Sequence, residues 1–378
     1  MTRSAAFLSI LLLICWLSTA RGQEPDKRTI KLLDDVIKEY GLVGMTCCVI
    51  KDGKIVALGS AGVRKFGTDK PITVDDKIHL GSCTKAMTAT LAAQLIEEKK
   101  LTWETKLLDV FPKLKDEINE AFHNVTLTDL LTHQSGVVKN NVGGWPQNKP
   151  IRALRYELIK KSLKPLPENK VGEFFYSNLG YITAGAMLEK ISNRSWEDLI
   201  QERLFEPLDM KSAGFGPPGL KLFNSKSAKR RNESKKIDQP WGHIKNMDGE
   251  WQPIRFDNPP ILGPAGTVHC SIKDWAKFVS LHVSWVKRKP ELLNRESLKR
   301  LQAGQSNEGN AYGWFSMPRR WGKGNVLNHN GSNTFWMANV WASPKVDFAV
   351  MTVTNCCSDD VTKPIDVVAT AMIDRFLR

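Results

Sequence analysis

The spacing of apolar residues along residues 26–57 predicts a helix followed by a strand hairpin. Residues 26–40 place apolar side chains at three- and four-residue intervals, as an amphipathic helix does, and Gly41 is suited to end that helix. Residues 45–57 contain two short apolar runs around Asp52-Gly53, a dipeptide typical of tight hairpin turns. We therefore expect the first regular elements to be one helix and two antiparallel strands.

The middle of the chain has a mainly helical pattern that continues to about residue 215. Residues 84–100 contain no Gly or Pro, and Met87, Leu91 and Leu95 recur at four-residue steps, which predicts a helix with an apolar stripe. Residues 217–260 are instead rich in Gly, Pro, Lys and Asn. This composition predicts a long irregular segment, such as a lid beside a site.

Strand patterns return in the last part of the chain. Residues 326–329, 336–341 and 348–354 resemble successive antiparallel strands, and residues 365–377 resemble a helix. This order predicts an α+β fold, an α/β sandwich whose antiparallel sheet is built from both chain ends, is flanked by helices and receives a mainly helical insertion. The predicted parts of a single domain over 23–378 are 23–81 and 255–378 for the sheet, 82–215 for the helical region and 217–254 for the loop or lid insertion.

The composition fits a large folded domain with a basic surface. The chain has 378 residues, of which 42% are hydrophobic and 25% charged, which is enough for a sizeable core. Its formal net charge of +14 favours anionic partners such as cell-wall polymers, lipid headgroups or carboxylate substrates. The densest basic run, residues 221–236, lacks interleaved aromatic residues and any nucleic-acid motif. We interpret it as a solvated loop and expect no nucleic-acid partner; electrostatic binding of polyanions is the alternative.

Residues 1–22 have the pattern of a signal peptide. Arg3 precedes an apolar stretch over 5–20 that is short for a transmembrane helix, and small residues at 20 and 22 allow cleavage before Gln23. We therefore expect an exported protein, periplasmic or secreted, without a transmembrane anchor after cleavage. An uncleaved N-terminal anchor is the alternative.

Six cysteines follow the predicted cleavage site, and none of them has metal-site spacing. The sequence contains no C-x-x-C pair and no His/Cys cluster spaced for zinc, so neither a metal nor another cofactor is predicted. Export would permit disulfides, but small buried residues are the favoured interpretation. In each adjacent pair at most one side chain is expected to face the core, because neighbours on a strand point to opposite faces. The six are Cys47, Cys48, Cys83, Cys270, Cys356 and Cys357.

The first candidate catalytic motif is Ser82-x-x-Lys85, at the start of the helix predicted over 84–100. A serine hydroxyl needs a base to become a nucleophile. A buried lysine one helical turn away can be that base, because burial lowers the pKa of the amine. Ser284-x-x-Lys287 has the same spacing, so this motif alone is weak evidence.

Two further motifs follow along the chain. Tyr176-x-Asn178 lies between an apolar run and a predicted helix, where residues two apart can project into one cleft. His329-x-Gly331, followed by Ser332, ends a predicted strand. Each of these has an ordinary structural interpretation when taken alone, as a packed tyrosine with a turn asparagine and as an edge histidine before a glycine turn.

Together and in this order, the three motifs resemble those of the serine β-lactamase-related superfamily. That group includes class C β-lactamases, D-Ala-D-Ala carboxypeptidases, D-aminopeptidases and β-lactamase-like esterases. The stretches 130–136, 207–210 and 263–266 are similar to the family as well. The resemblance implies a β-lactamase/transpeptidase-like fold and extends over most of the chain after the predicted signal peptide.

The resemblance also implies a role for each motif residue. Ser82 would attack an acyl carbonyl and form an acyl-enzyme. Lys85 and Tyr176 would share the work of the general base, with the nearby ammonium favouring the phenolate form of the tyrosine. The backbone N–H groups of Ser82 and Ser332 would form the oxyanion hole. Asn178 would hold Lys85 and contact the substrate, and Asn330 and Gly331 would also bind the substrate.

One departure from the family pattern bears on the substrate. Class C β-lactamases usually have Lys-Thr-Gly as the third motif, whereas this chain has His329 in place of the lysine. A histidine with an unperturbed pKa of about 6.5 is mostly neutral near neutral pH, so we expect anionic substrates to bind better below about pH 6.5. The predicted function is therefore an exported hydrolase of an amide or ester, acting on a small molecule or a peptide, with cell-wall fragments among the candidates. The alternatives are a β-lactamase proper and a non-catalytic protein that binds or senses cell-wall fragments.

Overall fold

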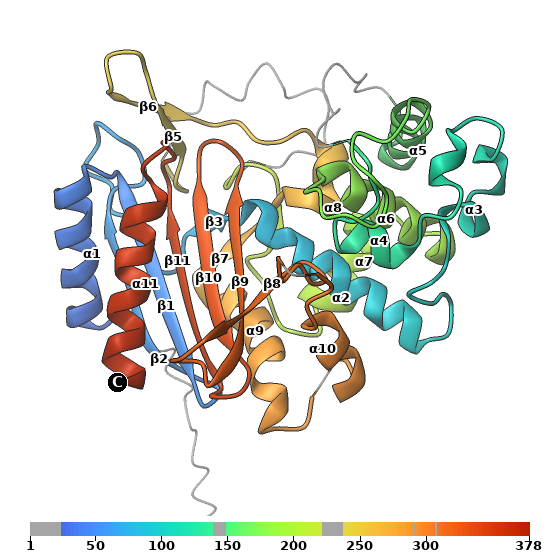
Figure 1. Ribbon diagram of the computed structural model, residues 1–378. Helices are drawn as coiled ribbons and strands as arrows, with labels where there is room; N and C mark the ends of the chain where they lie inside the picture. Colours follow the sequence, from blue (N-terminus) through green and yellow to red (C-terminus); the bar gives the residue numbers. More distant parts are fainter. Residues whose placement is uncertain (1–23, 139–148, 221–236, 291, 307) are drawn as a thin grey trace, which may run out of the picture.

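The computed structural model describes residues 24–138, 149–220, 237–290, 292–306 and 308–378 (Figure 1). The predicted signal peptide and the basic run 221–236 therefore lie outside the described residues. Within the described ranges, no helix is both long and apolar enough to cross a bilayer.

A six-stranded antiparallel sheet forms one half of the molecule. The strand β1 (Gly44–Lys51) pairs with β2 (Lys54–Gly62) on one side and with β11 (Phe348–Thr354) on the other, so the sheet is indeed built from both chain ends. Asp52 and Gly53 both adopt positive φ values, 50° and 67°, in the hairpin turn that the sequence predicted. The other strands follow in the order β10 (Met337–Ser343), β9 (Gly324–Ser332) and β8 (Phe315–Arg319).

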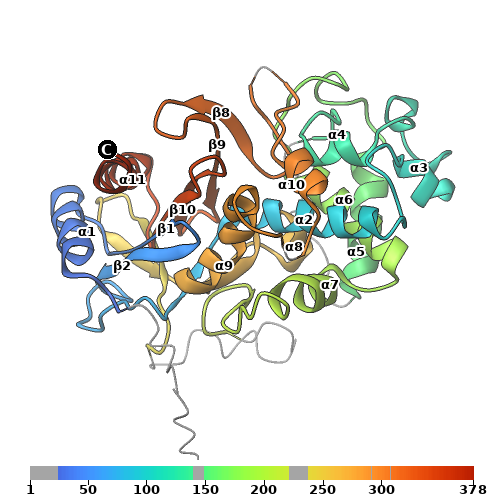
Figure 2. The same ribbon diagram turned by 90° about the horizontal axis from the view of Figure 1, so that it is seen from below.

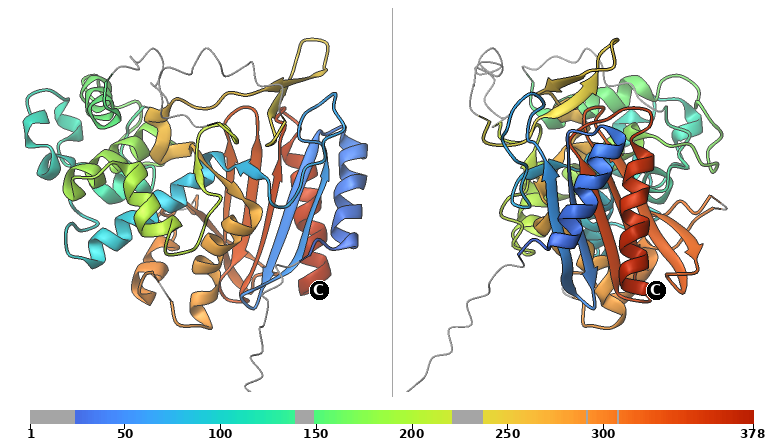
Figure 3. Two further views of the ribbon diagram at one scale, coloured as in Figure 1. Left: turned by 180° about the vertical axis from the view of Figure 1, so that it is seen from behind. Right: turned by 90° about the vertical axis from the view of Figure 1, so that its left-hand side faces the viewer.

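Helices cover both faces of this sheet. On one face α1 (Lys27–Tyr40) and α11 (Thr362–Leu377) lie side by side, as the right-hand view of Figure 3 shows. Asp26 caps α1 by accepting a hydrogen bond from the Thr29 amide. On the other face α9 (Ile272–Val283) packs against β1, β10 and β11. The predicted fold class, an antiparallel sheet flanked by helices, is confirmed.

The helical region surrounds α2 (Thr84–Glu97), which contacts α6 (Asn178–Ser192), α8 (Gly263–Gly266) and α10 (Arg295–Leu301) (Figure 2). The sequence predicted one apolar stripe on α2, but nearly every residue of its first three turns is buried. The small Ala and Thr side chains outside the stripe let neighbouring segments approach from the other sides. The remaining helices are α3 (Leu107–Val110), α4 (Leu127–Leu131), α5 (Ile151–Ser162) and α7 (Trp196–Ile200).

Residues 61–80 were expected to form loop and a short strand, and the structure confirms that strand, whereas the other short strands outside the main sheet were not predicted. The strands β3 (Lys77–His79), β7 (Val268–Ser271) and β4 (Gly214–Phe215) form a small sheet at the junction of the two halves. A separate hairpin joins β5 (Gly242–Lys245) to β6 (Trp251–Ile254). The expectation of wholly irregular chain over 217–260 is therefore wrong for this hairpin, because strands of four residues carry too little periodicity to be recognised.

The six cysteines of the described chain are free thiols; five of them are buried, as the favoured interpretation expected, and Cys357 is half-buried. The expectation that only one member of an adjacent pair faces the core is wrong for Cys47 and Cys48. Cys47 packs in the layer of α1 and α11, whereas Cys48 packs in the core that contains α9. Both side chains are buried because helices cover both faces of the sheet.

Candidate active site

The turn that carries Ser82 fits directly against the end of β9. Ser82 lies in a 3₁₀ turn, Gly81–Cys83, that leads into α2. Gly81 has a φ of +50°, and a Cβ added there would lie 2.4 Å from the backbone nitrogen of Ser332. A Cβ on Gly331 would lie 2.0 Å from the Leu80 carbonyl oxygen. Two glycines, one directly before Ser82 and one in the third motif, thus allow the Ser82 turn and β9 to touch.

Lys85 is buried beside Ser82 and is held by neutral oxygens. Its Nζ lies 3.0 Å from Ser82 Oγ, 2.6 Å from Asn178 Oδ1 and 2.7 Å from the Ala265 carbonyl oxygen. Burial lowers the pKa of the amine to about 7. A neutral amine has two N–H groups and one lone pair, so the amide and carbonyl oxygens can take both N–H groups while the lone pair faces the serine hydroxyl.

Tyr176 completes the contact with the nucleophile from the other side. Its hydroxyl shares a hydrogen bond with the Ser82 side chain, and burial raises the pKa of the phenol. The ring stacks on His133 at a centroid distance of 4.3 Å and lies 4.9 Å from Lys85 Nζ. The expectation of a phenolate is therefore wrong: desolvation of the buried ring opposes the negative charge and outweighs the hydrogen bond with Ser82, which favours it.

His329 faces this group from β9 and is neutral. Its ring centroid is 6.5 Å from that of Tyr176. Nδ1 lies 2.6 Å from the Asn330 carbonyl oxygen, which can only accept, so the hydrogen of the neutral ring is on Nδ1. Burial, and then the nearby charge of Lys85, lower the pKa of His329 to about 3. The expectation of tighter anion binding below pH 6.5 through this imidazole is therefore wrong.

The other residues of the third motif have different surroundings. Ser332 places its backbone nitrogen close to Gly81, while its hydroxyl accepts a hydrogen bond from the Thr334 amide. Gly331 provides the close approach to Leu80. The Asn330 side chain instead accepts a hydrogen bond from Asn339 on the adjacent strand, so the structure does not bring it to Ser82. Neighbouring residues of a strand point to opposite faces, and His329 takes the face of the site.

The second S-x-x-K sequence has ordinary structural contacts. Ser284 donates to the buried carboxylate of Asp347, and the exposed Lys287 pairs with Asp52. Neither contact resembles the surroundings of Ser82.

Sequence reasoning missed two residues that hold the catalytic group. His133 stacks on Tyr176 and accepts a hydrogen bond from the Ser177 amide. Ala265 contributes only its carbonyl oxygen to Lys85. Both lie in stretches that resemble the family, 130–136 and 263–266, but a backbone acceptor or a stacked ring leaves no signature in the spacing of polar residues.

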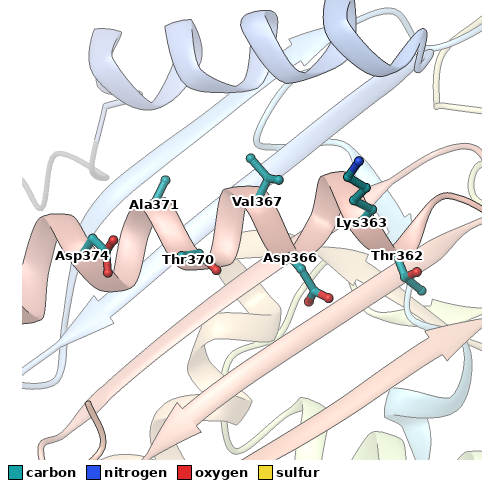
Figure 4. Close-up of a pocket in the computed structure, with 7 residues that line it drawn as sticks. All are labelled: Thr362, Lys363, Asp366, Val367, Thr370, Ala371 and Asp374. Carbon is teal, nitrogen blue, oxygen red and sulfur yellow. The ribbon is translucent and has the colours of Figure 1, made fainter. Parts of the chain in front are cut away.

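Other places where a ligand could bind lie away from Ser82. A hollow of about 630 Å³ on α11 is lined by residues from Thr362 to Asp374 (Figure 4). It lies across the sheet from the α2 half of the molecule. Among the described residues, no group of three or more His, Cys, Asp or Glu side chains could hold a metal ion.

Comparison with known proteins identifies the family. The model of the β-lactamase family matches residues 29–369 of this chain. The chain belongs to the β-lactamase family. This confirms the resemblance inferred from the three motifs and places the protein among relatives of the serine hydrolase class.

Individual relatives are distant in sequence but similar in fold. Penicillin-binding protein 4 of Amycolatopsis lactamdurans is 26% identical over 252 residues, which are 66% of this chain and 62% of that protein. The chain thus spans less than two thirds of the length of this curated relative. The octameric penicillin-binding protein homologue from Pyrococcus abyssi has a TM-score of 0.72 at 22% identity, covering 93% of this chain and 77% of its own. A class C β-lactamase from Rhodobacter sphaeroides has a TM-score of 0.71 at 19% identity, and the match covers 93% of this chain and 99% of that β-lactamase. These likenesses show the β-lactamase fold.

Proposed function

We propose that this β-lactamase-family protein is an exported serine hydrolase that forms an acyl-enzyme on Ser82 and cleaves an amide or ester. The observation that carries the proposal is the environment of Lys85. Its amine is buried, has a pKa lowered to about 7, and lies 3.0 Å from the serine hydroxyl. An amine in this state is a base of suitable strength at neutral pH. The signal-peptide pattern of residues 1–22 supports export.

Acylation follows from these contacts. Lys85 takes the Ser82 proton as Oγ bonds to the substrate carbonyl carbon, and the carbonyl electron pair moves to oxygen. The backbone N–H groups of Ser82 and Ser332 stabilise that oxyanion. As the bond to the leaving group breaks, the proton on Lys85 is passed to the leaving group through the Tyr176 hydroxyl. A neutral phenol suits this relay because it can give one proton and receive another.

Deacylation uses the same groups in reverse. A water molecule gives its proton to Lys85, through Tyr176, as its oxygen attacks the acyl carbon. The bond between that carbon and Ser82 Oγ then breaks, Oγ recovers a proton, and the acid is released. Tyr176 and Lys85 thus return to their starting states after each turnover.

The third motif favours an ester or an open-chain amide as the substrate over a β-lactam. A lysine at position 329 would offer a fixed positive charge to a substrate carboxylate. His329 is neutral here, with its pKa lowered to about 3. Esters and peptides that lack a carboxylate next to the scissile bond do not need that charge. A peptidase or esterase is therefore favoured over an efficient β-lactamase.

Covalent labelling tests the proposal. A fluorophosphonate probe is expected to add one adduct per protein molecule, detected by intact mass, in the wild type and in Ser284→Ala. The adduct should be absent in Ser82→Ala. Ser284 is the matched control because it has the same S-x-x-K spacing, but its lysine, Lys287, is exposed and pairs with Asp52. A folded wild-type protein that takes up no adduct would overturn the proposal.

A substrate panel distinguishes the reaction types. Short-chain p-nitrophenyl esters, a D-Ala-D-Ala peptide and a chromogenic cephalosporin are compared on the wild type and Ser82→Ala. We expect Ser82-dependent turnover of an ester, with slow hydrolysis of the cephalosporin and of the D-Ala-D-Ala peptide, because both carry a carboxylate that the neutral His329 does not pair with. Efficient cephalosporin hydrolysis would instead favour the β-lactamase alternative. Binding of cell-wall fragments that survives Ser82→Ala, without any turnover, would favour the non-catalytic one.

A further inference from the structure

A buried histidine and aspartate lie directly behind the Ser82 turn, outside the group already described. His79 is fully buried at the end of β3, and its Nε2 lies 2.9 Å from Asp257 Oδ2. Its Nδ1 lies 3.1 Å from the Gly81 amide nitrogen. A backbone amide can only donate, so Nδ1 is the acceptor and the ring hydrogen is on Nε2, where it is donated to Asp257. One neutral tautomer satisfies both contacts.

Asp257 connects this histidine to the end of β9. Its other oxygen, Oδ1, accepts hydrogen bonds from Asn333 Nδ2 at 2.8 Å and from the Asn258 amide at 2.7 Å. Asn333 directly follows Ser332 in the chain and is itself buried. One carboxylate therefore links the residue before Ser82, through His79, to the residue after Ser332.

The same segment also reaches the peptide that holds Lys85. Asn258 Nδ2 donates to the Gly266 carbonyl oxygen at 2.9 Å. Gly266 follows Ala265, whose carbonyl oxygen accepts from Lys85. The segment 257–258 is thus bonded to all three pieces of chain that meet at Ser82: the nucleophile turn, the end of β9 and the α8 segment.

We propose that His79, Asp257 and Asn333 are positioning residues that fix the spacing of the two oxyanion-binding amides; this inference rests on the proposed function. The N–H groups of Ser82 and Ser332 come from two segments that lie far apart in the sequence. An oxyanion hole works only when both donors lie about 2.7–3.1 Å from the developing charge. One buried carboxylate accepts hydrogen bonds from both sides and so holds that separation. Losing these hydrogen bonds should weaken binding of the transition state more than binding of the substrate.

The decisive variant is Asp257→Asn. The new amide keeps the size of the side chain and can still accept from Asn333. Toward His79, however, an amide N–H would face the ring N–H at Nε2. Moving the ring hydrogen to Nδ1 relieves that clash but places an N–H against the Gly81 N–H. Either arrangement breaks one contact in the link. We expect kcat to fall about 10- to 100-fold with KM changed less than about threefold, because a displacement of about 1 Å near the reaction can cost about 10² in rate.

Asp274→Asn is the matched control. Asp257 and Asp274 are each 6% exposed. Asp274 lies in the first turn of α9, away from the Ser82 turn, and its carboxylate accepts hydrogen bonds from the Ser212 amide and hydroxyl. The control is expected to lower the melting temperature at least as much as Asp257→Asn does while changing kcat less than about twofold.

Two more measurements separate positioning from a merely structural role. A boronic acid that forms a tetrahedral adduct on Ser82 should bind Asp257→Asn more weakly by the same factor as the loss in kcat/KM. His79→Gln should recover part of the activity lost in His79→Ala, because a carboxamide can accept from Gly81 and donate to Asp257. If Asp257→Asn fails to fold, His79→Gln and Asn333→Ala, which removes only one arm of the link, provide the same comparison.

The outcomes distinguish this inference from the proposed function. No fluorophosphonate adduct on folded wild-type protein would remove the proposed function and this inference with it. Normal labelling and turnover by the wild type, with the folded Asp257→Asn and Asp274→Asn variants equally active, would overturn the positioning role alone. An equal rise in KM and fall in kcat/KM, with kcat unchanged, would also overturn it.

Discussion

A carboxylate placed next to Lys85 should move the pH dependence of the reaction. The amine has a pKa of about 7 because it is buried among neutral oxygens, one of which is Asn178 Oδ1 at 2.6 Å. In the wild type the rate of acylation should follow the neutral amine. It is therefore expected to fall about tenfold for each pH unit below about pH 6 and to level off above about pH 8.

The variant Asn178→Asp tests this explanation. An anion in direct contact favours the ammonium form and raises a pKa by about 1–3 units, which moves the acidic limb from about 7 to between about 8 and 10. At pH 7 the neutral fraction of Lys85 would fall from about one half to between a tenth and a thousandth. The rate at that pH should accordingly drop between about fivefold and 500-fold, and rise again as the pH increases.

The assay is the pH profile of kcat/KM for a p-nitrophenyl ester, followed at the isosbestic wavelength of the product. Asn178→Ala is the control, because it removes the amide without adding a charge. Its rate should fall, but the midpoint of its acidic limb should stay near 7. The reasoning is wrong if Asn178→Asp keeps the wild-type midpoint, or if Asn178→Ala shifts the midpoint as far as Asn178→Asp does.

Four further variants probe other parts of the structure. Tyr176→Phe should lower kcat by about 10²–10⁴ for an amide and clearly less for a nitrophenyl ester, whose leaving group needs no proton; equal losses in steady-state assays would contradict the relay. In the wild type, the free energy of unfolding should rise by at most about 1.4 kcal/mol per pH unit between about pH 7 and 10.5, and Lys85→Met should abolish this rise. Its sign follows from the lowered pKa of the folded amine, since the unfolded chain binds more protons in that window; urea titrations of both proteins measure it. Gly81→Ala, at a φ of +50° against Ser332, should cost about 1–3 kcal/mol and most of the activity, and a normal kcat in this variant would contradict the close approach. Arg155→Ala should destabilise the fold by about 3–5 kcal/mol, because it leaves the buried Glu189 and the neighbouring Glu197 without their partner; calorimetry that shows no loss would exclude a structural role for this ion pair.

The sequence was sufficient for the main elements of the fold. The helix before Gly41, the Asp52-Gly53 hairpin and the strands of residues 326–354 carry strong local signals, and the structure confirms them. The strands β4, β5 and β6 carry none, because two to four residues are too few to show alternation. Whether α2 is covered on one side or on all sides depends on segments distant in sequence, so its spacing of apolar residues could not show it.

The candidate site was predictable in its residue types but not in its charges. Three short motifs named Ser82, Lys85, Tyr176 and His329, and the structure brings these side chains together. The phenolate form of Tyr176 and the protonation of His329 near pH 6.5 were wrong expectations because burial, which decides both, is a property of the packed site. The contact between His79 and Asp257 joins residues 178 positions apart. No pattern in the sequence pairs them.

The pairing of β1 with β11 has a consequence for the time at which activity can begin. In that pair Met45 faces Thr354, so a strand near the start of the chain pairs with one near its end. His329 and Ser332 lie on β9, which is also synthesised late. During synthesis, a ribosome-bound chain that already carries Ser82, Lys85 and Tyr176 still lacks half of its oxyanion hole, and β1 has an open edge. Such an intermediate would be inert toward substrate and prone to wrong strand pairing. Under the proposed mechanism, hydrolysis therefore requires the C-terminal strands of the sheet to be in place.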